Sequence, residues 1–138
     1  MTAEEARRRF SESRVARLAT ADAAGVPHIV PVVFALDGDE IFIAVDRKPK
    51  RTTALKRLAN VRENPRVALL ADGYDDRDWY ALWWVRADGV GRVVAPGSPD
   101  ARRAVALLAA RYRQHVEAPP EGPVLVVAVH RWSGWSAR

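Results

Sequence analysis

A run of basic residues is the most prominent feature of this sequence that could take part in chemistry. Residues 47–66 hold eight arginines or lysines and one glutamate, a net charge of +7, whereas the rest of the 138-residue chain sums to −2. Charge concentrated in this way indicates an anionic partner, such as a phosphorylated or polycarboxylate small molecule or a nucleic acid. The alternative is a solvated cationic surface, which is the commoner origin of such runs.

A helix would gather the polar groups of this run. Residues 52–63 have a helical pattern, and Asn64-Pro65 ends it. At 100° per residue, one face is expected to carry Thr53, Lys56, Arg57 and Asn60, opposite Leu55, Leu58 and Ala59. The helix N-terminus, whose free N–H groups favour an anion, is expected to carry Lys50, Arg51, Thr52 and Thr53. The pattern predicts a phosphate or carboxylate cradle, with an exposed cationic face as the alternative.

A proline interrupts the β-rich segment VPHIVPVVFAL at 26–36. Pro31 removes a backbone donor in the middle of the strand, which is typical of an edge strand or a bulge. It also fits a strand whose free backbone groups face a flat ligand. The residues of this candidate ligand strand are Ile29, Val30, Pro31, Val32 and Val33.

Tryptophans gather in DWYALWWVRADG at 78–89. Strand alternation places Trp79 and Trp83 on one face and Trp84 on the other, and both faces are largely apolar. One face could pack on the core and the other on a second subunit or a planar ligand, because tryptophan is enriched at interfaces. Core packing is the alternative for each tryptophan alone.

Other kinds of chemistry have no support in the sequence. There is no cysteine, which excludes disulfides, thiolate zinc sites and a cysteine nucleophile, and the three histidines show no metal spacing. No nucleophile elbow, dinucleotide fingerprint or carboxylate pair is present. We therefore assign no catalytic residue and predict no metal. An enzyme of this kind would take its chemistry from a cofactor.

The elements that must position these residues are mostly short strands. The length predicts one domain over 1–138, and the lack of a signal sequence or an apolar span agrees with a cytoplasmic protein. The elements we expect are helices at 3–12, 52–63 and from 98 onward, strands at 15–20, 26–36, 40–46, 66–71 and 124–130, and a long strand or a hairpin about Asp88-Gly89 at 79–94. Segment 15–46 is expected to be an antiparallel meander. About six such strands predict a mainly-β fold with helices, a small β-barrel rather than a wound parallel sheet.

In this order the segments resemble the split-barrel superfamily that binds flavins and deazaflavins, the pyridoxamine-phosphate-oxidase-like proteins. Within it they are most similar to the actinobacterial F420-dependent oxidoreductases. The resemblance covers nearly the whole chain, and its most specific part runs from Lys56-Arg57 through Asn60 to NPRV at 64–67. The matching segments are GVPHIVPVVFAL, EIFIAVD, KPKRTTALKRLANVRENPRVALL, WWVRADGVGRV and RWSGWSA.

The resemblance implies a six-stranded split β-barrel, the FMN-binding split barrel, in an intertwined homodimer with two cofactor sites at the subunit interface. It implies that the cofactor ring lies against the strand of Ile29, Val30, Pro31, Val32 and Val33. It places the phosphate at Lys50, Arg51, Thr52, Thr53, Lys56 and Arg57, and leaves open whether Lys56 or Arg57 is the main ligand. The strand at 79–86 would come from the partner subunit, with Trp79, Trp83 and Trp84 as pocket walls.

The activity implied by the resemblance is hydride transfer from reduced coenzyme F420 to a small unsaturated organic acceptor. F420 carries a phosphate and a polyglutamate tail, so a segment of net charge +7 fits it better than FMN, which has one phosphate. The strand of Ile29 to Val33, against which the cofactor ring is expected to lie, is called the ring strand. His28 is the one candidate proton donor beside it, and solvent is the other candidate source of the proton. The expected partners are a second copy of the chain and a small-molecule substrate, not a membrane or a nucleic acid.

Three alternatives stay open at this stage. The same fold could bind FMN or haem, or the protein could bind F420 without catalysis. Nucleic-acid binding through residues 47–66 is disfavoured, because the aromatic residues lie in a separate strand instead of between the basic ones.

Overall fold

A computed structural model describes residues 1–44 and 51–138, the side chains of 51–55 excepted. The end of the strand expected at 40–46 therefore lies outside the described residues, as does Lys50. The elements in chain order are α1 (Ala3–Glu12), β1 (Ala16–Ala21), β2 (Pro27–Val32), β3 (Ala35–Asp37), β4 (Glu40–Ala44), α2 (Arg51–Glu63), β5 (Arg66–Gly73), the 3-10 helix η1 (Trp79–Ala81), β6 (Trp83–Val94), α3 (Pro99–Arg111), α4 (Arg113–Glu117) and β7 (Val124–Ser136).

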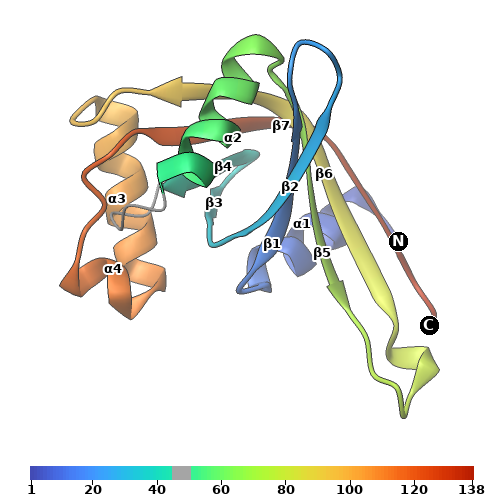
Figure 1. The fold of residues 1–138 in the computed structure, drawn as a ribbon. Coiled ribbons are helices and arrows are strands. Elements are labelled where there is room, and N and C mark those ends of the chain that lie inside the picture. Colours follow the sequence, from blue (N-terminus) through green and yellow to red (C-terminus); the bar gives the residue numbers. More distant parts are fainter. Residues whose placement is uncertain (45–50) are drawn as a thin grey trace.

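The described strands form one antiparallel sheet in the order β2-β1-β5-β6-β7-β4-β3 (Figure 1). β2 and β3 lie at opposite ends of this order, yet β2 ends at Val32 and β3 begins at Ala35. With about 3.8 Å between consecutive Cα atoms, that connection spans at most about 11 Å. The two edges of the sheet must therefore approach each other there, so the sheet curls into a barrel.

The expected mainly-β antiparallel fold with helices is confirmed, but the number and order of strands differ from our expectation. The segment 26–36 forms two strands instead of one, so the described sheet has seven strands rather than six. The meander expected over 15–46 is also wrong. β2 pairs with β1 and β3 pairs with β4, but β2 and β3 lie at opposite ends of the described sheet and do not pair with each other. The chain crosses from one edge of the sheet to the other at residues 33–34, where Phe34 is fully buried.

The hairpin considered at Asp88-Gly89 is not formed. β6 runs straight through this dipeptide, and the irregularity there is a shift in its register with β7. A Cβ on Gly89 would lie 2.5 Å from the carbonyl oxygen of Ala128 on β7. Gly89 therefore allows two strands to approach closely and does not form a turn. Glycine is used within strands for such close approaches as well as in turns, so the sequence alone does not distinguish the two.

The strand expected to start at residue 79 begins four residues later. Residues 79–81 form η1, whose start is capped by the Asp78 carboxylate accepting from the Tyr80 N–H at 3.1 Å. β7 runs on to Ser136 instead of ending at 130, because it pairs with β6 as far as Trp83. Figure 1 shows this end of β5, β6 and β7 projecting as an arm on the side away from α2 and α3.

Helices α1 and α3 begin at the caps that the sequence indicates. Thr2 Oγ1 accepts from the Glu5 N–H at 3.1 Å, and Ser98 Oγ accepts from the Ala101 N–H at 3.2 Å. α1 places Phe10 in the main core, and α2 adds Leu58 and Val61 to it. In the described part of the chain, no helix is long and apolar enough to cross a membrane.

Candidate cofactor site

The predicted ring strand lies at an edge of the sheet. Among the described strands, β2 pairs only with β1, so its other edge is free, and Pro31 stands opposite Arg17 in the register. This confirms the edge-strand interpretation of Pro31. Ile29 and Pro31 are exposed on one face, Ile29 at 66%, whereas Val30 and Val32 face the core. Val33 lies beyond β2 and packs against α3.

α2 is rotated relative to our prediction. Asn60 is fully buried instead of sharing an outer face with Lys56, and Ala59, expected on the packed side, is exposed. The reason is Val61, which enters the core together with Leu58 and so turns the helix. The side chains of Lys56 and Arg57 project from the helix in directions about 100° apart, so they lie in different surroundings.

Arg57 is half-buried and lacks a carboxylate partner among the described residues. Its buried Nε has no hydrogen-bond partner among the described residues, and burial lowers the pKa of the guanidinium because the charged form loses hydration. Lys56 is more exposed, and its Nζ lies 4.0 Å from an Asp22 carboxylate oxygen. Of the two, Arg57 is the cation that lacks a counter-charge in this part of the protein.

A polar cluster fastens α2 to the β1–β2 hairpin. The Asn60 side-chain amide donates to Thr20 Oγ1 at 3.0 Å, and both residues are buried. Thr20 stands directly opposite His28 in the register, so these two side chains share the inner face. The buried His28 Nδ1 and Asn60 Oδ1 have no hydrogen-bond partner in the part of the chain that the structure describes. His28 therefore points to the opposite face from Ile29, its neighbour in the ring strand.

The three predicted pocket tryptophans do not lie together. Trp79 belongs to η1 and is 68% exposed at the tip of the arm. Trp83 packs on the core beside α1, where the Arg9 guanidinium lies 5.5 Å from its ring centre. Trp84 lies on the other face of β6, opposite Trp135 of β7. The described cleft at Trp83, of about 360 Å³, is lined by Arg8, Arg9, Glu12, Ser13 and Trp83.

Within one chain these tryptophans are also far from α2. A Cβ on Gly91 of β6 would lie 3.1 Å from the Val61 side chain, which fixes where α2 meets that strand. Trp83 precedes Gly91 by eight residues, or about 26 Å of extended strand. The tryptophan strand and the basic helix of a single chain therefore do not form one pocket.

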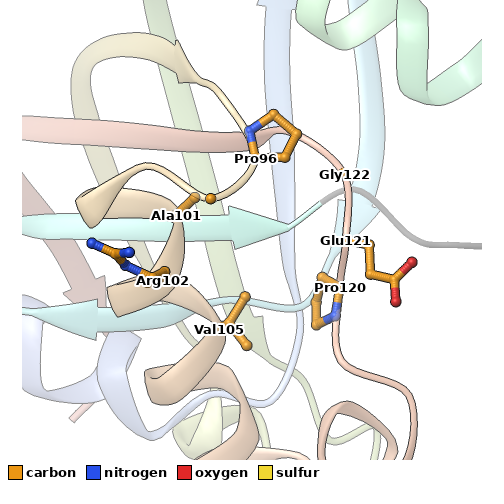
Figure 2. Close-up of a pocket in the computed structure, with 8 residues that line it drawn as sticks. Pro96, Ala101, Arg102, Val105, Pro120, Glu121 and Gly122 are labelled. Carbon is orange, nitrogen blue, oxygen red and sulfur yellow. The ribbon is translucent and has the colours of Figure 1, made fainter.

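A separate pocket of about 260 Å³ lies between α3 and the segment that leads into β7. Figure 2 shows Val105, Pro96 and Pro120 lining it, with the side chains of Arg102 and Glu121 directed away from its centre. None of the predicted site residues whose side chains are described lines this pocket, so within the described structure it is separate from the predicted site.

The side chains of Arg51, Thr52 and Thr53 lie outside the described residues, although their backbone begins α2. Their contact with an anion stays a prediction. Sequence reasoning did not anticipate the pairing of Trp84 with Trp135, although alternation along β7 could have found it. It also missed the contact of Arg9 with Trp83, for which the sequence holds no signal. The described residues contain no group of three metal-ligating His, Cys, Asp or Glu.

Known proteins resemble this chain over almost its whole length. The model of the family described as pyridoxamine 5′-phosphate oxidase matches residues 2–136. No curated protein matches the chain.

Solved structures share the fold at low identity. A conserved hypothetical protein of Mycobacterium tuberculosis is 24% identical with a TM-score of 0.76, and the match covers 100% of this chain and 86% of that one. An FAD-binding protein of Mesorhizobium loti is 20% identical with a TM-score of 0.72, over 97% of this chain and 94% of that one. The heme storage protein HutZ of Vibrio cholerae is 18% identical with a TM-score of 0.73, over 99% of this chain and 95% of that one.

At these identities the solved structures establish the fold, and the match over residues 2–136 establishes the family. The sheet whose edges meet at residues 33–34 agrees with both. The chain therefore belongs to the pyridoxamine 5′-phosphate oxidase family and has its split-barrel fold.

Proposed function

We propose that this protein is an F420-dependent oxidoreductase that reduces a small unsaturated organic molecule. Its family binds flavins or haem, which supports a redox cofactor at the β2–α2 edge. The choice of F420 rests on charge. F420 would bring a phosphate and several carboxylates, and residues 47–66 carry a net charge of +7. Bound there in its reduced form, it would supply a hydride.

The observation that carries this proposal is the state of Arg57. A half-buried guanidinium without a carboxylate partner in the described structure has lost part of its hydration and has gained no counter-charge. An anionic group of a ligand would supply that charge, and the planar fork of arginine suits phosphate and carboxylate oxygens. We therefore propose Arg57, rather than Lys56, as the main contact to the phosphate.

The other residues of the site would bind and orient. The free edge of β2 offers backbone groups to a flat ring, and exposed Ile29 and Pro31 offer apolar contact beside it. Holding cofactor and acceptor face to face would supply much of the acceleration. His28 points to the inner face, so we propose that solvent, and not His28, delivers the proton.

We further propose that a second copy of the chain completes the site. One face of β2, β1, β5, β6 and β7 carries the exposed apolar side chains Ile29, Leu70, Val90 and Trp135. α1 and α2 meet β6 on its other face, at Trp83 and Gly91. Charged residues such as Arg17 and Arg86 lie on the same face, and exposed apolar side chains in such a polar setting are typical of a subunit interface. A partner packed on it would bring the tryptophan strand that one chain cannot bring to its own α2.

The names of two relatives support an alternative cofactor. An FAD-binding protein and a heme storage protein share the fold, so FMN or haem at the same edge is the competing proposal. A protein that binds F420 without turnover is the other.

A titration of the protein's tryptophan fluorescence with oxidised F420, and in parallel with FMN, tests these proposals. Quenching by F420 alone at micromolar concentrations or below supports the proposed cofactor, and oxidation of the reduced form by an enone then tests catalysis. Preference for FMN would replace F420 and keep the site. Tight binding of F420 with no oxidation by any acceptor would leave a binding protein. Binding of neither would refute the proposal.

A further inference from the structure

Among the described strands, β2 is supported from one side only. It pairs with β1 along six residues, and Pro31 contributes no backbone donor. At its start, the contact of Thr20 with Asn60 ties the hairpin to α2. At its other end, where the chain leaves β2 for β3, the ladder to β1 has stopped at Val32. Something else must fix the position of residues 33–34.

The Tyr112 hydroxyl occupies that place. It accepts from the backbone N–H of Phe34 at 3.4 Å and from Arg111 Nε at 3.0 Å, and it donates to the carbonyl oxygen of Arg14 at 2.9 Å. Tyr112 is 7% exposed and Phe34 is fully buried. The end of α3 is thereby joined both to the connection between β2 and β3 and to the segment that enters β1.

Packing around the same point supports this connection. The Phe34 ring lies 4.6 Å from the ring of Phe10, between centres, and the Arg111 guanidinium lies 4.7 Å from its centre. Val33 and Ala35, on either side of Phe34, pack with Leu108 and Tyr112. Arg111 also donates to the backbone carbonyl of Ser11 at 2.6 Å and to that of Ser13. The end of the ring strand is thus held from behind by α3.

We propose that Tyr112 is a positioning residue of the cofactor site, whose hydroxyl sets where the end of β2 lies relative to a bound ring. The role in cofactor binding rests on the function proposed above. Tyr112 itself is directed into the protein and would not contact the cofactor.

Tyr112→Phe is the test variant, because it keeps the ring on which the Arg14 guanidinium stacks at 4.6 Å and removes only the hydroxyl. The matched control is Val126→Ala. Val126 is fully buried and belongs to a core cluster with Phe42 and Ala104, which does not include Tyr112. Both variants should melt at a lower temperature than the wild type. Affinity for F420 and for FMN is then measured at a temperature at which all three proteins are folded.

We expect Tyr112→Phe to weaken binding of the preferred cofactor about tenfold, as the loss of one anchoring hydrogen bond would. We expect Val126→Ala to bind as the wild type does. Unchanged affinity in Tyr112→Phe, or equal losses in both variants, would overturn the proposal, since either result reduces Tyr112 to a contributor to stability.

Hydrogen exchange of the Phe34 amide in the cofactor-free protein gives a second readout. We expect exchange about tenfold faster in Tyr112→Phe and unchanged in Val126→Ala. An unchanged rate in Tyr112→Phe would overturn the proposal whatever the affinities are. A wild-type protein that binds neither cofactor would instead refute the proposed function, and faster exchange would then still support the anchoring of the strand.

Discussion

Replacing Arg57 by methionine should weaken cofactor binding without weakening the fold. In the free protein the guanidinium is half-buried and its Nε has no described hydrogen-bond partner, so methionine, which keeps the apolar stem, removes no described ion pair. In the complex the same change removes a hydrogen bond between two charged groups. Such bonds contribute about 1.5–3 kcal/mol, which corresponds to about 10- to 150-fold in the dissociation constant.

Lys56→Met is the matched control on the same helix. The lysine side chain is 49% exposed, and its described carboxylate partner, that of Asp22, is 4.0 Å away. An exposed lysine that pairs with an anionic group of the cofactor would contribute about 0–1 kcal/mol to binding. This variant should therefore lose at most about fivefold in affinity.

The assay combines a fluorescence titration at one fixed salt concentration with urea unfolding of the free proteins, because screening by salt would alter both charge effects. We expect the free energy of unfolding of Arg57→Met to equal or exceed that of the wild type, since a desolvated charge without a described counter-charge has been removed. Wild-type affinity in Arg57→Met, or a larger loss in Lys56→Met, would refute the assignment of the anion to Arg57.

Three further substitutions test other parts of the structure. Asn60→Ala should lower the free energy of unfolding in urea by about 1–3 kcal/mol, because it leaves a buried hydroxyl on β1 without its donor; no loss would mean that the contact is dispensable. Gly89→Ala should cost about 1–3 kcal/mol in the same assay, because its methyl group would lie 2.5 Å from the Ala128 carbonyl oxygen. Trp135→Glu should convert the proposed dimer to monomers in light scattering, whereas Val116→Glu, at an exposed site on α4, should not. Equal masses for the two variants would exclude the apolar sheet face as the interface.

Local signals in the sequence predicted the helix starts well. Thr2 and Ser98 cap α1 and α3 because capping needs only a side-chain oxygen and the N–H groups three residues ahead. The edge position of β2 was also readable, since Pro31 can be tolerated only where a donor is not needed. Both effects are contained within a few residues, which is why sequence alone reveals them.

Long-range packing decided what the sequence could not show. The face of α2 that turns inward depends on where Val61 meets the barrel, and this contact takes Asn60 out of solvent and onto Thr20. Asp88-Gly89 is a turn signal by type, but the glycine is required by the backbone of β7, which comes about 40 residues later. In both cases the local pattern allows two arrangements, and a distant partner selects one.

The separation between the basic helix and the tryptophans has a consequence for any assay of this site. About 26 Å of strand lies between Gly91, beside α2, and Trp83, so a ligand held by Arg57 is remote from the Trp83 and Trp84 of its own chain. If a second copy supplies those tryptophans in a two-fold symmetric dimer, each chain contributes its tryptophans to the α2 helix of the other. The dimer then has two equivalent sites. Quenching of Trp83 and Trp84 by direct contact with a cofactor at Arg57 then requires the dimer. It should fade as the protein is diluted below the dimer dissociation constant, and in Trp135→Glu it should be lost at every concentration at which that variant is monomeric.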